Sequence, residues 1–200
     1  MTPGPAGHAD SARRTSKGKH VKRIWTVGHS TRTIEEFTRL LKAFDIRRLA
    51  DVRRFPGSRR YPQYNKAALC DSLAAAGIEY FHFPELGGRR KPKPDSPNTA
   101  WRNESFRGYA DHMETPEFHE AIARLAAVAS EPTVLMCAEV LWWRCHRALI
   151  SDYLKARGTE VTHILDFGKS ELHPFTSAAT ITHRGLSYSS PQPELRDSVK

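Results

Sequence analysis

The chain has 200 residues, of which 39% are hydrophobic, and it carries a formal net charge of +9. No apolar run is long enough for a membrane-spanning helix, no apolar segment at the N-terminus predicts a secretory signal, and the three cysteines do not form a disulfide framework. This length suits one domain with a real core. We therefore expect a single reduced domain in the cytoplasm, without a membrane partner.

Much of the positive charge lies at the N-terminus. Residues 1–23 hold six basic residues against one acidic residue and are rich in Gly, Pro and Ser. This composition predicts a disordered basic tail, which serves solubility or binds polyanions weakly.

The pattern of residues 24–83 predicts three short strands separated by two helices. The strands are expected at 24–28, 47–52 and 78–83. Thr33 and Glu36 make a capping box for the first helix, and Asn65 and Gly77 bound the second. Cys70 on the second helix is expected to be a small buried hydrophobic residue.

Residues 84–114 lack periodicity and include a Pro-rich basic loop around residues 89–93. Further on, Thr115 and Pro116 begin a helix that reaches residue 129. A strand at 133–139, a helix at 145–158 and a strand at 161–165 follow. We expect the folded domain to span residues 24–169 and residues 170–200 to be a C-terminal tail.

Strands that alternate with helices predict an α/β fold, here a single domain with a mainly parallel sheet of about five strands and helices on both faces. Ligands of such sheets bind beyond the carboxyl ends of the strands. The polar loops that follow the strands therefore make one candidate site, to which the sequence contributes His29, Ser30, Asp51, Arg53, Ser58, Arg59, Gly87, Gly88, Glu139, Cys145, His146 and Arg147.

The stretch MCAEVLWWRCHRALI at 136–150 carries the most reactive side chains. Cys145 lies where a helix begins, and the positive end of the helix dipole favours a thiolate. A nucleophilic or redox-active Cys145 is one interpretation, and a packed thiol beside an anion site is the other. Cys137 and Cys145 form a disulfide only if the loop between them folds back.

A metal site would combine Cys137, Cys145 and His146, with His29 or Glu139 as a fourth ligand. The spacing matches no established zinc pattern, and adjacent Cys145 and His146 are not expected to reach one ion from a helix start. The preferred interpretation therefore assigns no metal ligands and leaves the cofactor unknown.

An anion site is the better supported interpretation, because arginines cluster in two of the loops and guanidinium groups suit phosphate or carboxylate. Gly87 and Gly88 either allow close backbone approach to a ligand or form a turn. Asp51 is expected to pair with arginine, whereas Glu139 either does so or takes part in acid/base chemistry. Aromatic residues nearby, such as Tyr61 and Trp143, suit stacking on a nucleobase.

Four motifs, TVGHST, LADVRRFPGSRRYPQY, ELGG and CAEVLWWRCHRALI, occur in this order between residues 26 and 150. With them the chain resembles the family called domain of unknown function 488, over roughly residues 24–167. The resemblance implies an α/β domain and places His29, Asp51, Arg53, Ser58, Arg59, Glu139, Cys145, His146 and Arg147 in the family's site. The apolar VLWW segment replaces a polar, proline-containing loop of other members.

These observations predict a small cytoplasmic enzyme that acts on a phosphate-bearing substrate, a nucleotide or nucleic acid. Arg53, Arg59 and Arg147 would bind the anion, Glu139 or His146 would move a proton, and Cys145 would be an anion-site or nucleophilic thiol. The alternatives are a non-catalytic nucleic-acid-binding module and a metal- or redox-responsive protein. Fold alone does not decide among them.

Overall fold

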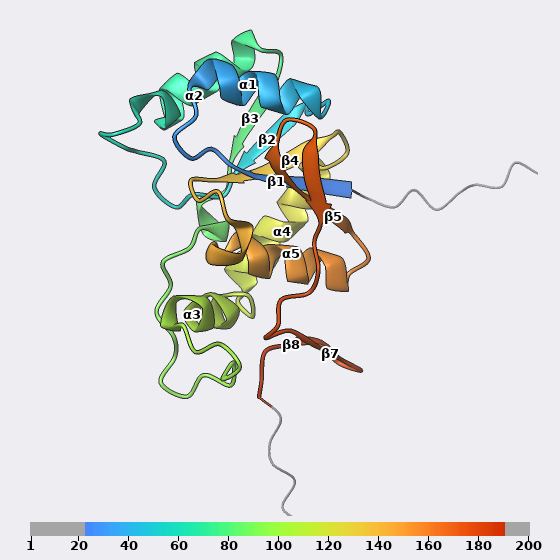
Figure 1. Cartoon of the computed structure of the whole chain (residues 1–200). Helices are drawn as coiled ribbons and strands as arrows, with labels where there is room; N and C mark the ends of the chain where they lie inside the picture. The colour runs from blue at the N-terminus through green and yellow to red at the C-terminus, as the bar shows by residue number, and fades with distance from the viewer. Residues whose placement is uncertain (1–22, 191–200) are drawn as a thin grey trace, which may run out of the picture.

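The computed structural model describes residues 23–190, and the predicted N-terminal tail lies almost wholly outside them. Alternating strands and helices make an α/β domain (Figure 1). The strands are β1 (Arg23–Gly28), β2 (Arg48–Asp51), β3 (Glu79–His82), β4 (Thr133–Cys137), β5 (Glu160–Asp166), β6 (Lys169–Leu172), β7 (Thr180–Thr182) and β8 (Gly185–Ser187). The α-helices are α1 (Ile34–Ala43), α2 (Lys66–Ala75), α3 (Glu104–His112), α4 (Pro116–Val128) and α5 (Arg147–Ala156).

The main sheet has six strands in the order β3-β2-β4-β1-β5-β6. The first five run parallel, as the sequence predicts, and β6 pairs antiparallel with β5 at the edge. Parallel strands need crossover helices, which cover both faces. The carboxyl ends of β1, β2 and β4 therefore meet at one edge.

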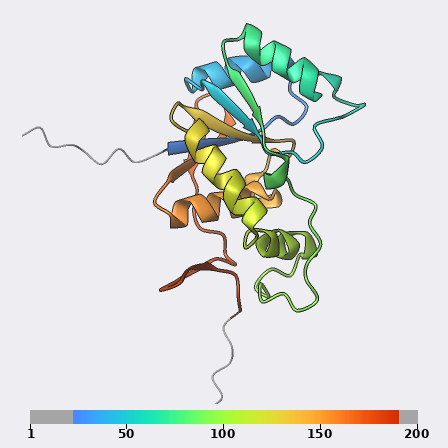
Figure 2. The ribbon, with the colours of Figure 1, turned by 180° about the vertical axis from the view of Figure 1, so that it is seen from behind.

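Two hydrophobic clusters fill the two faces of the sheet. Phe37 of α1 and Leu73 of α2 pack against the face that carries Val134. On the other face, Phe118 of α4 and Leu149 of α5 pack in the cluster that includes the strand residue Leu135. Figure 2, seen from behind, shows α4 on the face opposite α1 and α2. The predicted helices on both faces are thus confirmed.

Local signals place most elements correctly. The capping box predicted for α1 is present, since Thr33 Oγ1 accepts from Glu36 N and the Glu36 side chain accepts from Thr33 N. Asn65 precedes α2, but its side chain accepts from Ser58 N instead of capping the helix. Cys70 is exposed, so the prediction of a buried residue is wrong. Leu69 and Leu73, four residues apart, lie on the buried face of α2. Cys70 follows Leu69 directly and therefore lies outside this face, on the exposed side of the helix.

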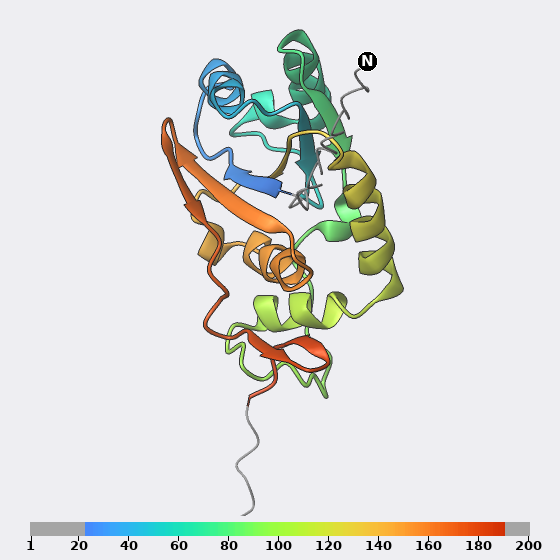
Figure 3. The same cartoon turned by 90° about the vertical axis from the view of Figure 1, so that its right-hand side faces the viewer.

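The structure corrects the sequence analysis at two segments. Residues 84–114, for which the sequence predicts no helix because they lack periodicity, contain α3, which follows the N-cap residue Asn103. Residues 170–190, expected to be a tail, complete β6 and form the β7–β8 hairpin. Figure 3 shows this hairpin beside α3, at the end of the molecule away from α1.

The domain boundary therefore lies beyond residue 169, because buried residues of this segment belong to the fold. His173 and Tyr188 are 2% and 3% exposed. Both bind Asp152 of α5. Within residues 23–190, no helix combines the length and the apolar character that crossing a membrane requires.

Candidate functional site

A cleft opens at the edge where β1, β2 and β4 end. It consists of two adjoining cavities of about 560 and 410 Å³. Both cavities are lined by the same central residues, so they form one cleft; the shared residues include His29, Tyr61, Gly88, Arg89, Cys137 and His146. This position is the one that the strand order predicts for a ligand site.

The floor of the cleft brings together Cys137, Cys145 and His146. One ligand atom from each, the two Sγ atoms and an imidazole nitrogen, lie within 4.8 Å of one another. Cys137 ends β4, and the loop after it folds back through the 3-10 turn η3 (Trp142–Arg144) to Cys145. Both thiols are free. The expectation that Cys145 and His146 cannot face one point is wrong, because Cys145 precedes the helix in an extended conformation.

Neighbouring groups change the acidity of the two thiols in opposite directions. Burial raises the pKa of Cys145, but a hydrogen bond from the Cys137 thiol and the charge and backbone N–H of Arg147 outweigh burial and lower this pKa to about 6. The same hydrogen bond, together with burial, raises the pKa of Cys137 well above its usual value. Such an arrangement provides a thiolate for nucleophilic attack, disulfide formation or metal binding.

Two histidines beside the thiols are held in their neutral forms. Burial lowers the pKa of His146, whose Nε2 donates to Val52 O at 3.1 Å. Burial also lowers the pKa of His29 to about 4. The ring of His29 stacks on Tyr64 with centroids 3.8 Å apart. Its Nδ1 bonds to Ser30 O, and its Nε2 faces Nη1 of Arg53 at 3.3 Å.

Asp51 and Arg53 form a buried ion pair below the cleft. Arg53 Nη2 lies 2.6 Å from Asp51 Oδ2, and the hydroxyl of Tyr80 donates to the same oxygen at 2.9 Å. Arg53 also donates to Tyr64 O. The pairing expected for Asp51 is present, and Arg53, although it lines one cavity, is largely engaged by these contacts.

Arg147 is buried and does not line the cleft. It is 1% exposed. Its Nη1 donates to Thr26 Oγ1 at 3.1 Å, and its Nη2 donates to the carbonyl oxygens of Glu139 and Val140. It therefore holds the β4–η3 loop onto β1, and its guanidinium, predicted to bind the anion, is engaged by these contacts.

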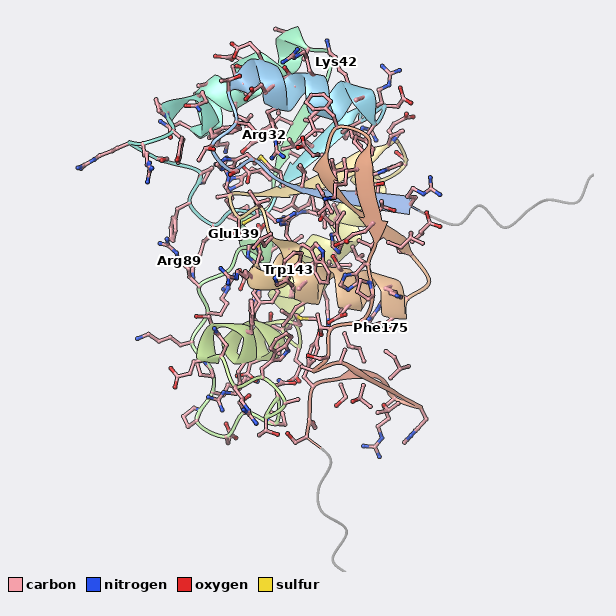
Figure 4. The ribbon with its side chains drawn as sticks, in the orientation of Figure 1. Arg32, Lys42, Arg89, Glu139, Trp143 and Phe175 are labelled. Carbon is pink, nitrogen blue, oxygen red and sulfur yellow. The ribbon has the colours of Figure 1, made fainter. Side chains whose placement is uncertain are left out.

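The exposed cations at the cleft are Arg54, Arg89 and Arg144. They come from three different loops and line the cavities. None of them forms an ion pair or a side-chain hydrogen bond within residues 23–190. Figure 4 shows Arg89 and Glu139 on the same side of the molecule. Free guanidinium groups around one cleft can bind an anionic ligand.

The predicted site residues separate into two groups. The cleft is lined by His29, Ser30, Arg53, Ser58, Gly88, Glu139, Cys145 and His146. The residues that do not line it are Asp51, Arg59, Gly87 and Arg147. Arg59 is exposed, and Gly87 is buried so closely against Arg54 that an added Cβ would lie 2.5 Å from that residue's Cβ.

One wall of the cleft, formed by Ser105 and Phe106 at the start of α3, was not predicted from the sequence. The signal available was Asn103, whose side chain accepts hydrogen bonds from the backbone N–H groups of both residues. Asparagine is a preferred N-cap residue. The Pro-rich loop before it hid this short helix.

Comparison with known proteins supports a family assignment. Neither the curated proteins nor the solved structures that were compared with the chain gave a match. One family model, described as Domain of unknown function DUF488, matches residues 33–154. The match covers more than half of the chain and includes the loops of the cleft after β2 and β4. The chain therefore belongs to the DUF488 family.

Proposed function

We propose that this chain is an enzyme that acts on a phosphate-bearing substrate, a nucleotide or a nucleic acid, bound in the cleft. The observation that carries this proposal is the arrangement of Arg54, Arg89 and Arg144 around the two adjoining cavities of the cleft, with no ion pair or side-chain hydrogen bond of their own in the described part of the chain. Three free guanidinium groups suit the oxygens of a phosphate chain.

Two further features support a nucleotide: aromatic rings for the base and a helix N-terminus for the phosphate. Tyr61 and Phe106 line the same cavity as Arg144, and aromatic rings beside arginines stack on bases. The N-terminus of α5 also lies at the cleft floor, where His146 is its N-cap residue. A helix N-terminus favours negative charge.

Glu139 is the group best placed to move a proton. It is exposed, lines the cavity, and its carboxylate accepts only a long bond of 3.4 Å from Leu141 N within the described residues. Cys137, Cys145 and His146 at the floor of the cleft line the same cavity as Glu139. The free thiols suit a reducing compartment, and we place the enzyme in the cytoplasm.

The test measures binding and turnover separately. ADP and a short single-stranded oligonucleotide are titrated by calorimetry against the wild type and the variants Arg54→Ala, Arg89→Ala and Arg144→Ala. Loss of one charge-assisted hydrogen bond should weaken binding about tenfold or more. Arg39→Ala, an exposed arginine on α1, is the matched control and should bind like the wild type.

Turnover is followed as product formation from a panel of nucleotides and oligonucleotides. We expect Glu139→Gln to retain binding and to lose turnover. Unchanged affinity in all three arginine variants would place the anion site elsewhere. Oligonucleotide binding that falls steeply with salt, without turnover of any ligand, would instead identify a non-catalytic nucleic-acid-binding module.

A further inference from the structure

We propose that Cys137, Cys145 and His146 bind one zinc ion at the floor of the cleft and leave one coordination position open. Two thiolates and one imidazole are ligands that zinc prefers, and three protein ligands with an open fourth position are typical of catalytic zinc sites. Ion binding does not depend on the proposed function, but the open position would bring the ion into contact with the substrate proposed there.

The distance between Cys145 Sγ and His146 Nδ1 matches that between two ligands of one tetrahedral zinc ion. Zinc lies about 2.3 Å from sulfur and about 2.0–2.1 Å from nitrogen, so a sulfur and a nitrogen ligand of one ion are about 3.5 Å apart. Cys145 Sγ and His146 Nδ1 are 3.5 Å apart. Cys137 Sγ completes a triangle whose atoms all lie within 4.8 Å of one another.

The tautomer of His146 is the one that a ligand requires. Its Nε2 donates to the carbonyl of Val52 at 3.1 Å, so Nδ1 carries the free lone pair, and this nitrogen faces Cys145. A backbone carbonyl on the second imidazole nitrogen is a common outer partner of zinc-bound histidine. The imidazole is thus oriented before any ion arrives.

The backbone explains how neighbouring residues can both be ligands. Cys145 has φ −124° and ψ 148°, whereas His146, the N-cap residue of α5, has φ −55° and ψ −15°. This change from extended to helical backbone directs successive side chains to one place. Gly88 leaves room there, because a Cβ at this position would lie 2.8 Å from His146 Nδ1.

The fourth position faces the cleft. His29 is not available as a ligand, because both of its ring nitrogens already have partners, Ser30 O and Arg53 Nη1. Glu139 lines the cavity but is not part of the compact group of ligand atoms. Water or a substrate oxygen can therefore take this position.

A nucleophilic thiol or a Cys137–Cys145 disulfide explains less of this geometry. A nucleophile needs one thiol and one base, and a disulfide needs two thiols. A nucleophile leaves Cys137 without a role, and a disulfide leaves His146 Nδ1 without one. A single soft metal ion uses all three groups.

The experiment measures metal binding by the full chain without any substrate. The metal-free protein, kept reduced, is titrated with zinc against a chromophoric chelator, and separately with cobalt(II) as a spectroscopic probe. We expect one ion per chain, and for cobalt a thiolate charge-transfer band together with the visible bands of tetrahedral coordination. A featureless cobalt spectrum, or an octahedral one, would overturn the proposal.

Variants identify the ligands. Loss of a residue that only hydrogen-bonds to a metal ligand weakens metal binding about 10- to 100-fold. Loss of a ligand itself should weaken zinc binding at least as much, so we expect this of Cys137→Ser, Cys145→Ser and His146→Gln. Cys70→Ser, the exposed thiol on α2, is the matched control and should bind zinc like the wild type. Equal affinity in all four variants would place the ion elsewhere, and circular dichroism shows whether each variant is folded.

Two other results also contradict the proposal. A Cys137–Cys145 disulfide that persists in reducing buffer would make the pair a redox site. Stoichiometric zinc binding that Cys70→Ser abolishes would make the exposed thiol the ligand. Because no nucleotide is present, failure here leaves the arginine test of the proposed function unaffected.

Discussion

The guanidinium of Arg53 donates two hydrogen bonds to the carboxylate of Asp51, from Nε to Oδ1 at 2.9 Å and from Nη2 to Oδ2 at 2.6 Å. Asp51 is 0% exposed and Arg53 is 9% exposed. The pair supports the cleft from below, because Arg53 also contacts His29 and the carbonyl of Tyr64. An arginine that the sequence suggests for substrate binding thus serves mainly to fix the loop after β2.

Removing one partner of this pair should destabilise the fold strongly. Arg53→Met leaves the Asp51 carboxylate buried without its cation, which costs about 3–5 kcal/mol. The double variant Asp51→Leu/Arg53→Met should lose less than the single variant, because no uncompensated charge remains. Urea unfolding measures both. Arg59→Met, an exposed arginine in the same loop, is the control and should change stability by no more than about 0.5 kcal/mol.

Gly28 should tolerate no larger residue, because β1 ends directly against the β4–η3 loop. A Cβ at this position would lie 2.0 Å from Glu139 O and 2.7 Å from Val140 Cα. Gly28→Ala must therefore displace the backbone of that loop, at a cost of about 1–3 kcal/mol. It should also weaken nucleotide binding, because this loop leads directly into η3, which carries Arg144.

Gly57→Ala is the matched control for this substitution. No atom lies within 4 Å of the place that an added Cβ would occupy at Gly57, and its φ is not in the left-handed region. Alanine there should leave stability unchanged or raise it by about 0.4–1 kcal/mol. Thermal unfolding and ADP titration of the two variants separate the two positions, and equal effects would contradict the close approach at Gly28.

The sequence predicts the sheet and the place of the site well, because both follow from periodicity. Helical and strand patterns indicate the parallel β1–β5 arrangement, and the strand ends indicate the loops of the cleft. Strands β6–β8 were missed because they are three or four residues long and largely exposed, so they show no buried alternation. Helix α3 was missed partly because Gly108 interrupts its pattern.

The roles of individual charged and reactive residues could not be predicted in the same way. The sequence shows that Arg147 and Arg144 are cations three residues apart, but only packing shows that the first is buried and the second exposed. The convergence of Cys145 and His146 depends on a backbone change between them. Local patterns do not encode such a change, because tertiary contacts impose it.

The C-terminal segment should contribute to stability through Asp152 of α5. This buried carboxylate accepts hydrogen bonds from His173, Thr176 and Tyr188, all beyond the domain boundary that the sequence suggested. Tyr188→Phe removes a donor at 2.9 Å. Hydrogen bonds to charged groups contribute about 1.5–3 kcal/mol, so this loss should appear in urea unfolding.

The control for Tyr188→Phe is Tyr153→Phe on α5. The hydroxyl of Tyr153 makes no hydrogen bond within residues 23–190, and the contact of its ring with Arg157 persists in phenylalanine. We expect this variant to unfold like the wild type. If both variants are equally stable, residues 173–188 do not support the core.

The protein should lose stability in mild acid because His163 is buried in its neutral form. Burial and the nearby His173 and Arg147 lower the pKa of His163 from 6.5 to about 2. Thr26 and His173 occupy its two ring nitrogens, and Trp142 stacks on the ring at 4.3 Å. No room remains for a hydrated imidazolium.

The direction of the effect follows from proton uptake. Between pH 6.5 and 2 the unfolded chain binds a proton at this histidine and the folded chain does not, so stability is full above pH 6.5 and falls as the pH is lowered. From pH 6.5 to 5 the loss from one such histidine is about 1.6 kcal/mol. His163→Gln should therefore show a shallower decline of unfolding free energy over this range. His183→Gln, an exposed histidine in the β7–β8 turn, should retain the wild-type decline, and identical slopes in the two variants would show that His163 does not titrate on unfolding.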